Sequence, residues 1–416
     1  MKRVRKIALA ATSIAVVVSA SVGGASTPAW AAPSPGAPAA PVEVVKADGS
    51  RCIQSSVNGT AVEECSTVSR RGPRLAQVPQ TRAELQRRAA RADKGKDRAA
   101  ALAPPEACDE GYSNPDRYTS CSKDGWQLVQ SRTVNGVTTV VGTLDFDDTS
   151  WASFNRGTPS WELGVQVQVG AGTGVFIAGT RAELTNACAL RPRVCGNSAA
   201  AGSVVSLTPF TSFEETWSQY NNGPSVTSAG VVDTLTRNIG PVFRSLPGTT
   251  PSWQWDESET NSLWGRCDSV LTSTGCVDHV SPLILIYNTQ THPKVGPVAE
   301  HVYDAQRTLP SRWGVPESGG NPLSRTLSQA DIDANRAVAC SGSPPVAGTS
   351  CDEYPLATTR QGAAFVGPHN YSIRYVADSA QDSQGGLNTA FYNGQRVIPD
   401  DHFWVLAVLA NGSRSW

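Results

Sequence analysis

Two adjacent carboxylates stand between a cysteine and a Tyr-Pro pair in the run Cys351-Asp352-Glu353-Tyr354-Pro355. Such carboxylates can hold a divalent cation and accept a proton from water, which are the two requirements of metal-assisted phosphodiester hydrolysis. The proline and a disulfide at the preceding cysteine predict a rigid turn that presents both negative groups. A turn of this composition is by itself an ordinary solvated bend, so its chemistry depends on the residues around it.

Four further polar residues are candidates for the same chemistry. His301 has apolar neighbours at the start of a helical pattern, where it is either a hydrogen-bonded packing residue or a contact to phosphate. Arg325 and Arg336 suit phosphate binding, because a guanidinium group matches two phosphate oxygens. Arg336 is equally suited to tying its helix to a carboxylate. Asn388 is a weaker candidate for substrate binding.

The order of short motifs across residues 282–409, about a third of the chain, resembles the NucA/NucB family of extracellular deoxyribonucleases. Several ordered blocks of this kind are difficult to obtain by chance. The blocks are His301-Val302-Tyr303-Asp304-Ala305, Leu323-Ser324-Arg325, Asn335-Arg336 with Ala339-Cys340, Cys351-Asp352-Glu353-Tyr354-Pro355, Gln384-Gly385-Gly386-Leu387-Asn388 with Phe391-Tyr392, and Arg396-Val397 with Asp401-His402-Phe403-Trp404-Val405.

This resemblance implies a ββα-metal-type nuclease domain that hydrolyses DNA with Mg²⁺ or Mn²⁺. By position, Asp352 would be the general base in place of the histidine of related folds, and Glu353 would orient it or contact the cation. The family places a metal-binding asparagine shortly before the Gly-rich stretch, where this chain has Gln381. Glutamine keeps the amide oxygen but is one methylene longer, so Asp382 is an alternative ligand.

The elements expected around these motifs are mixed. An apolar run at 282–287 predicts a strand, and helical spacing predicts helices over 298–306 and 328–339, the second with a capping-box-like start at Ser328. Further strands are expected at 372–376, 395–398 and 403–409, the last apolar enough to be central. The expected fold class is therefore α+β, with the nuclease domain at 277–416.

Residues 106–276 carry a β pattern. Two runs at 126–134 and 137–146 flank Asn135-Gly136, which is a strong hairpin signal, and residues 161–169 alternate between apolar and polar side chains. A sandwich or an irregular barrel is expected, of unknown role. Its tryptophans are either structural core or a platform for sugar stacking; they are Trp151, Trp161, Trp217, Trp253 and Trp255.

Ten cysteines occur as neighbouring couples, and no CxxC spacing is present. In an exported chain this favours disulfides between neighbours over metal thiolates, although sequence alone does not prove connectivity. The expected couples are Cys52 with Cys65, Cys108 with Cys121, Cys188 with Cys195, Cys267 with Cys276, and Cys340 with Cys351.

The first 31 residues combine a basic start, a short apolar run and small residues, so they are expected to be a signal peptide. Residues 32–105 read as a low-complexity and charged linker or pro-segment, in which 81–102 is best explained as a solvated helix. The apolar run is too short to span a bilayer. We therefore expect a secreted, monomeric protein without a membrane anchor, and no immunity or inhibitor protein can be named.

The formal net charge of -1 argues mildly against a polyanionic substrate. Residues 277–416 contain twelve acidic and nine basic side chains, so DNA binding would depend on local arginines and a cation and would lack sequence specificity. Two alternatives remain open. One is a non-catalytic secreted binding protein that keeps the nuclease fold, and the other is a glycan or cell-wall binder that acts through the β region.

Overall fold

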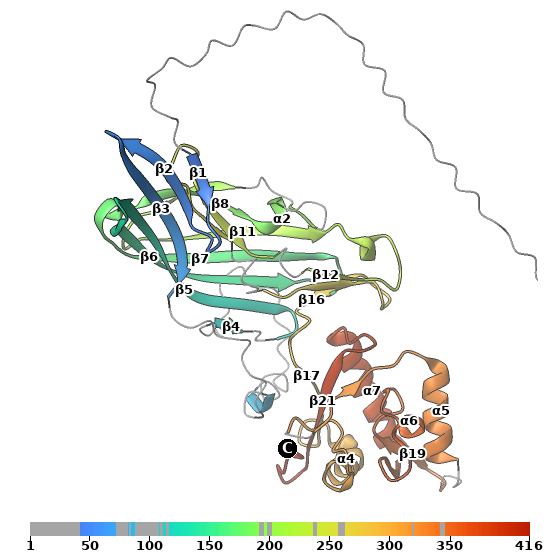
Figure 1. Ribbon diagram of the computed structural model, residues 1–416. Coiled ribbons are helices and arrows are strands. Elements are labelled where there is room, and N and C mark those ends of the chain that lie inside the picture. The colour runs from blue at the N-terminus through green and yellow to red at the C-terminus, as the bar shows by residue number, and fades with distance from the viewer. Residues whose placement is uncertain are drawn as a thin grey trace, which may run out of the picture. The chain divides into compact units, whose positions relative to one another are not determined.

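The computed structural model describes residues 42–71, 82, 85–87, 108, 111–113, 116–190, 195–197, 202–235, 239–256, 263–317, 320–341 and 346–416. The predicted signal peptide at 1–31 lies outside these residues, as does more than half of the predicted linker at 32–105. The linker prediction is wrong for residues 42–70, because they form three strands of the large sheet. The described residues form a strand-rich part, here called the β region (residues 42–277), and a mixed C-terminal domain (residues 278–416) (Figure 1).

A nine-stranded antiparallel sheet forms most of the β region. Its strands follow the order β1-β2-β3-β5-β6-β7-β11-β9, and β4 pairs with β5. The bounds are β1 Val42–Val45, β2 Arg51–Val57, β3 Thr60–Arg70, β4 Gly111–Ser113, β5 Thr119–Val134, β6 Val137–Phe154, β7 Ser160–Gly172, β9 Cys195–Asn197 and β11 Ser212–Asn221.

Both local predictions for this sheet are confirmed. β5 and β6 form a hairpin around Asn135 and Gly136, which have φ values of 51° and 79°. Positive φ at both positions is the geometry of a tight hairpin turn, and it explains the Asn-Gly pair. β7 alternates as expected, with Trp161, Leu163 and Val165 buried.

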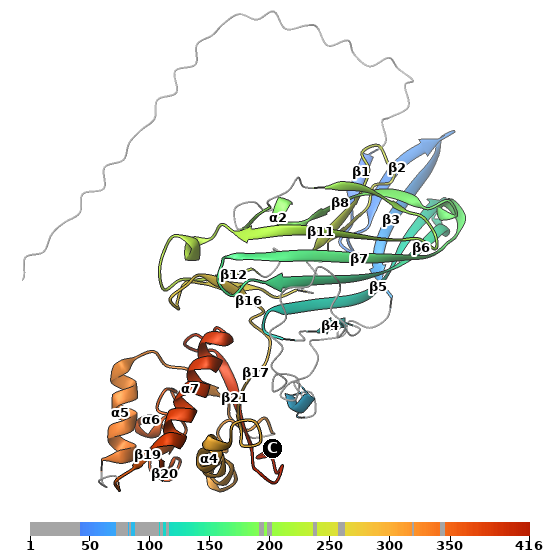
Figure 2. The same cartoon turned by 180° about the vertical axis from the view of Figure 1, so that it is seen from behind.

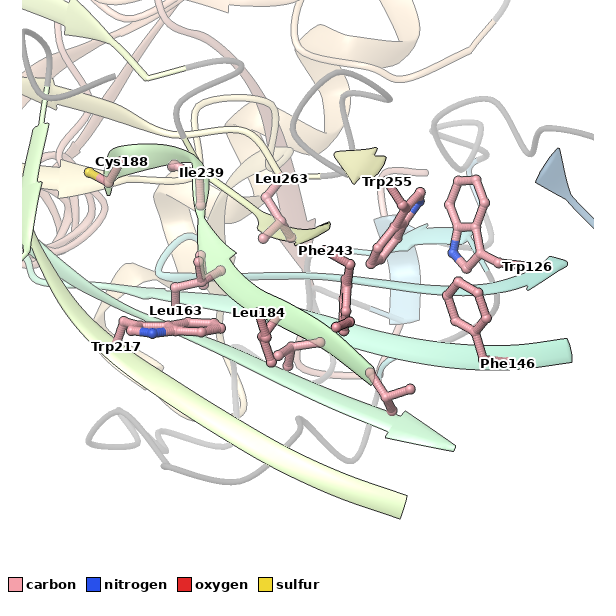
Figure 3. Close-up of a cluster of buried hydrophobic side chains, with 14 of the residues drawn as sticks. Trp126, Phe146, Leu163, Leu184, Cys188, Trp217, Ile239, Phe243, Trp255 and Leu263 are labelled. Atoms are coloured by element: carbon pink, nitrogen blue, oxygen red, sulfur yellow. The ribbon is translucent and has the colours of Figure 1, made fainter. Parts of the chain in front are cut away.

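A four-stranded sheet packs against the large one and completes a sandwich-like core. Its order is β10-β8-β13-β14. In Figure 3, Leu184 and Phe243 of this sheet lie among Trp126, Phe146 and Trp217 of the large sheet, in one buried cluster. The bounds are β8 Thr180–Asn186, β10 Ser203–Leu207, β13 Pro241–Ser245 and β14 Gln254–Asp256, and the short helix α2 spans Ala187–Leu190.

The tryptophans of the β region belong to the core. The five that were candidates for a sugar platform are all buried, and Trp255 packs on Phe243 with ring centroids 4.9 Å apart. The platform interpretation is therefore wrong for this structure, because the aromatic faces contact other side chains. No sheet among the described residues closes on itself, so the irregular barrel is wrong as well.

A third sheet joins the β region to the C-terminal domain. It contains β12 (Val232–Thr234), β15 (Arg266–Asp268) and β16 (Gly275–Val277). Cys267 and Cys276 face each other across β15 and β16 and form a disulfide. All five neighbour pairings predicted from the sequence are present as disulfides.

The C-terminal domain has two small sheets and four helices among its described residues (Figure 2). In the first sheet, β21 lies between β17, to which it is parallel, and β18, to which it is antiparallel. In the second, β19 pairs antiparallel with β20. The bounds are β17 Leu283–Asn288, α4 Gly296–Thr308, β18 Leu323–Ser324, α5 Gln329–Cys340, β19 Thr349–Tyr354, α6 Ala363–Val366, β20 Ser372–Ala377, α7 Asp378–Gly394 and β21 His402–Val408.

Most of these elements match their predictions. α4 buries Val298, Val302 and Ala305, the residues at helical spacing. α5 begins after Ser328, whose hydroxyl accepts a hydrogen bond from the Asp331 amide at 3.3 Å. This capping satisfies an amide that the first helical turn leaves without a partner.

The region after β20 contains a helix that was not predicted and lacks the strand that was predicted. Residues 378–394 form the helix α7, although Gly385 and Gly386 disfavour a helix. Both glycines have open space around their Cα atoms, so tertiary packing of the other helix face decides the outcome. The strand expected at 395–398 is absent: Arg396 has a φ of 45°, and the Val397 amide donates to Tyr392 at the helix end.

A buried group of charges connects the β region with the segment between α7 and β21. Asp401 accepts from Arg117 at 2.9 Å and from Arg266 at 2.6 Å, and both arginines are buried. Arg396 donates to Asp268 at 2.6 Å. We call these five residues the charged seam. The Arg117 and Arg266 guanidinium groups hold the pKa of Asp401 below its usual value against the opposing effect of burial.

Among the described residues, no helix combines the length and apolar character needed to cross a membrane.

Candidate active site

Asp352 lies on a strand, and the turn predicted for this motif is wrong. Asp352 is the fourth residue of β19 and pairs with Arg374 of β20. Side chains alternate along a strand, so Asp352 and Tyr354 point to the buried face while Glu353 points to the other. The two carboxylates therefore do not form one joint cation ligand as the turn implied. The hydrogen-bonding pattern of the β19–β20 pair overrides the bend preference of the Tyr-Pro sequence.

Asp352 is hydrogen-bonded to a buried histidine. His301 of α4 has Nδ1 2.7 Å from Asp352 Oδ2 and Nε2 2.9 Å from Ser372 Oγ, and His301 and Asp352 are each only 1% exposed. Both ring nitrogens of His301 are thus occupied. This arrangement supports the packing interpretation of His301 rather than a contact to phosphate, and it orients the Asp352 carboxylate.

Among the described residues, three buried side-chain oxygens on α4, β19 and α7 have no hydrogen-bond partner. They are Gln306 Oε1 on α4, Asp352 Oδ1 on β19 and Gln381 Oε1 on α7, which packs against β19. A buried oxygen without a partner is costly, so such atoms are typical of sites that receive a ligand. Carboxylate and amide oxygens are the ligands that Mg²⁺ and Mn²⁺ prefer. The Asp352 and Gln381 oxygens are therefore of the chemical kind that a hard cation binds.

The protein offers few ionisable ligands here. Within the described part of the chain, the only group of three or more His, Cys, Asp or Glu ligand atoms that converge is Cys52, Glu63 and Cys65, and its two cysteines form a disulfide. A cation beside Asp352 would thus take most of its ligands from water and phosphate, as Mg²⁺ commonly does. Asp382, the alternative ligand, is exposed on α7.

Glu353 is partly buried on the opposite face of β19. Burial and the nearby Asp352 charge raise its pKa to about 7, and the Arg336 guanidinium of α5 opposes this shift. Arg336 is exposed, so its proximity to Glu353 supports the interpretation that it ties the helix to a carboxylate. Asn335, the neighbouring residue, is buried and donates to the carbonyls of Ala357 and Thr359.

Arg325 is engaged within the domain. Its guanidinium carbon lies 4.5 Å from the centre of the Tyr392 ring, and Nη1 donates to the carbonyl of Val397. Burial lowers its pKa. These contacts hold α7 and the following segment together, and phosphate binding by Arg325 stays a prediction.

A tyrosine that the sequence motifs did not single out connects the site to the first sheet. Tyr287 of β17 is fully buried and donates to Asn388 Oδ1 at 2.6 Å. It also forms a hydrogen bond with Gln384, and the charge of Asp352 contributes to raising its pKa well above the usual value, after burial. Alternation along 283–287 was the available signal, since Leu283, Leu285 and Tyr287 share a face. The side-chain oxygen of Asn388 is therefore occupied by its hydrogen bond with Tyr287.

Disulfide and loop contacts position β19. Cys351 precedes Asp352 and is bonded to Cys340 at the end of α5. Tyr354 follows on the buried face and donates to the carbonyl of Trp313 at 2.6 Å, while its hydroxyl accepts from Gln306. The carboxylate of Asp352 is therefore held from both sides along the strand.

The comparisons with known proteins agree with this location. No curated protein and no solved structure matches the chain. Residues 322–406 match the family described as Deoxyribonuclease NucA/NucB, a span that includes β19 and α7 but begins after Tyr287 and His301. The C-terminal region of this protein therefore contains a NucA/NucB deoxyribonuclease domain.

Proposed function

We propose that the protein is a secreted, metal-dependent endonuclease that hydrolyses DNA phosphodiester bonds without strong sequence preference, with Asp352 as general base. The observation that carries the proposal is the Asp352 carboxylate. One of its oxygens is held by His301 and the other has no hydrogen-bond partner. A general base needs a carboxylate that is oriented through one oxygen and has no protein partner on the other.

The chemistry follows from this arrangement. Asp352 Oδ1 accepts the proton of the attacking water, and His301 keeps the carboxylate oriented through Oδ2. Gln381 Oε1 is the first choice for a cation ligand, with Asp382 as a second, and Glu353 acts on Asp352 through its charge. When bound, Mg²⁺ or Mn²⁺ would neutralise charge on the phosphate. We propose that β19, β20 and α7, which follow each other in this order, form the ββα unit.

Several features support secretion and a DNA substrate. The family that the C-terminal region matches consists of deoxyribonucleases, and five disulfides suit an oxidising exterior. The domain carries more acidic than basic side chains, so we expect weak and salt-sensitive DNA binding.

The test is cleavage of plasmid DNA by the purified protein with Mn²⁺, with EDTA, and as the Asp352→Ala variant. We expect nicking with Mn²⁺ that EDTA abolishes, and a loss of about 10²–10⁴-fold in the variant. Asp333→Ala is the matched control, because Asp333 is an exposed carboxylate on α5. Equal nicking by the wild type and Asp352→Ala would refute the assignment of the base.

A non-catalytic DNA-binding protein is the second candidate. Its supporting observations are the deep burial of Asp352 and the glutamine at the position where the family has asparagine. The same experiment separates the two: a folded wild type that shifts DNA in a gel but cleaves none with Mg²⁺, Mn²⁺, Ca²⁺ or Zn²⁺ would favour the binding protein.

A further inference from the structure

The first sheet of the C-terminal domain has apolar side chains on both faces. Leu285 and Tyr287 of β17 and Val405 of β21 belong to the core that includes residues of α4 and α7. The intervening residues point to the opposite face, because side chains alternate along a strand. This outer face is formed by Ile284, Ile286, Trp404, Leu406 and Val408.

A residue from far upstream covers part of this outer face. Leu85 has no exposed surface and packs in one cluster with Val315, Leu406, Val408 and Trp416. Residues 82 and 85–87 are helical.

An ion pair next to Leu85 also attaches this segment to the C-terminal domain. Arg82 donates to Glu317 at 2.7 Å, and Glu317 also accepts from Arg312 at 2.8 Å. Arg82 and Leu85 lie three positions apart, which places them on neighbouring positions of one helical turn. Two different contacts therefore join this segment to the C-terminal domain.

We propose that the outer face of the β17–β21–β18 sheet is a docking surface, and that its occupant is the chain's own Leu85 segment (residues 82 and 85–87). The segment lies between β3 and β4 in sequence, so it straps the β region to the C-terminal domain. A sheet with two apolar faces is stable only when both are covered. The Leu85 segment covers part of the outer face.

Leu85 is the residue on which the docking depends. It is the only large apolar side chain between positions 81 and 101 in a stretch of Ala, Arg, Lys, Glu and Asp. Apolar burial provides the main stabilisation, whereas an ion pair with a partly exposed arginine contributes little and mainly sets the register. The prediction of a solvated helix is thus wrong at Leu85.

The test is hydrogen–deuterium exchange on the full chain. In the wild type we expect the amides of residues 85–87 to exchange at least about tenfold more slowly than in an unstructured peptide. Leu85→Asp should reduce this protection to within about twofold of the peptide and should raise binding of an apolar dye. Val137→Asp is the matched control, because Val137 is 66% exposed in the β5–β6 hairpin.

Two results would overturn the proposal. One is a wild type whose residues 85–87 show no protection, a measurement that needs no variant. The other is a Leu85→Asp or Leu85→Ala variant with the exchange and dye binding of the wild type. Leu85→Ala serves if the aspartate variant does not fold. No DNA cleavage is measured, so failure here is distinguishable from failure of the proposed function.

Discussion

The β region and the C-terminal domain each bury one aspartate to the same extent, but the two carboxylates differ in their hydrogen-bond partners. Asp148 and Asp352 are both 1% exposed. Asp148 accepts from Trp126 Nε1 at 2.5 Å through one oxygen and from Ser150 Oγ at 3.0 Å through the other. Asp352 has a partner on Oδ2 only. A carboxylate satisfied on both oxygens stabilises a fold, whereas one left open at a fixed position is suited to bind or react.

The largest expected effect comes from exchanging each aspartate for asparagine. Asp352→Asn should lower DNA cleavage about 10²–10⁴-fold and leave the unfolding midpoint unchanged or raised, because it removes an unsatisfied buried charge. Asp148→Asn should retain cleavage. Plasmid nicking rates and thermal unfolding of both variants check this. If Asp148→Asn loses as much activity as Asp352→Asn, the comparison fails.

The second prediction concerns Asp401 of the charged seam, a buried carboxylate that two arginines pair and that should therefore stabilise the fold. Asp401→Asn leaves Arg117 and Arg266 buried without their carboxylate, which should lower the free energy of unfolding by about 3–5 kcal/mol. Asp400→Asn is the control, because Asp400 is 71% exposed and pairs with Arg360 at the surface. Urea unfolding followed by tryptophan fluorescence measures both. A loss below about 0.5 kcal/mol for Asp401→Asn, the level expected of a surface pair, would show that the seam is not structural.

His301 should act as a positioning residue for Asp352. His301→Ala should lower kcat about 10–100-fold, the effect of removing a hydrogen-bonded partner of a functional group, and should shift the pH profile of kcat. His292→Ala is the control, since His292 is exposed before α4. A lower amount of folded protein with unchanged kcat and pH profile would limit His301 to packing.

Gln381 should govern the cation requirement. Gln381→Ala removes the amide oxygen and should raise the Mn²⁺ concentration for half-maximal cleavage about tenfold, the lower end of the effect of losing a metal-site group. Gln329→Ala, at the exposed start of α5, should not. A titration of cleavage against Mn²⁺ gives both values. An unchanged midpoint in Gln381→Ala would move the assignment to Asp382.

The smallest expected effect is the dependence of the unfolding midpoint on pH that Asp148 of the β region causes. Burial raises the pKa of Asp148 to about 7. A carboxyl group with a raised pKa in the folded state stabilises the fold below its unfolded pKa of about 4, and this contribution is lost as the pH rises through about 7. Unfolding midpoints of the wild type should therefore fall between pH 5 and 8 more than those of Asp148→Asn. Parallel curves for the two proteins would contradict the shifted pKa.

Local patterns were sufficient wherever neighbouring residues decide the structure. The Asn135-Gly136 hairpin, the five disulfide pairs and the Ser328 cap follow from turn chemistry, short cysteine spacing and a side chain that satisfies a nearby amide. The central strand at 402–408 follows from its continuous apolar run. The ordered motifs also located the NucA/NucB domain.

Long-range packing decided what the sequence did not show. The Asp352–Glu353 motif is a strand because β20 pairs with it, and α7 forms despite its glycines because its other face packs against β17 and β19. Tyr287, Leu85 and Asp401 each meet partners about a hundred to more than three hundred positions away. Only the folded chain brings such residues together, because burial and charge pairing depend on distance in space. Sequence alone therefore identified the residue types for the chemistry, while the tertiary structure decided which oxygen of Asp352 is held and which is left open.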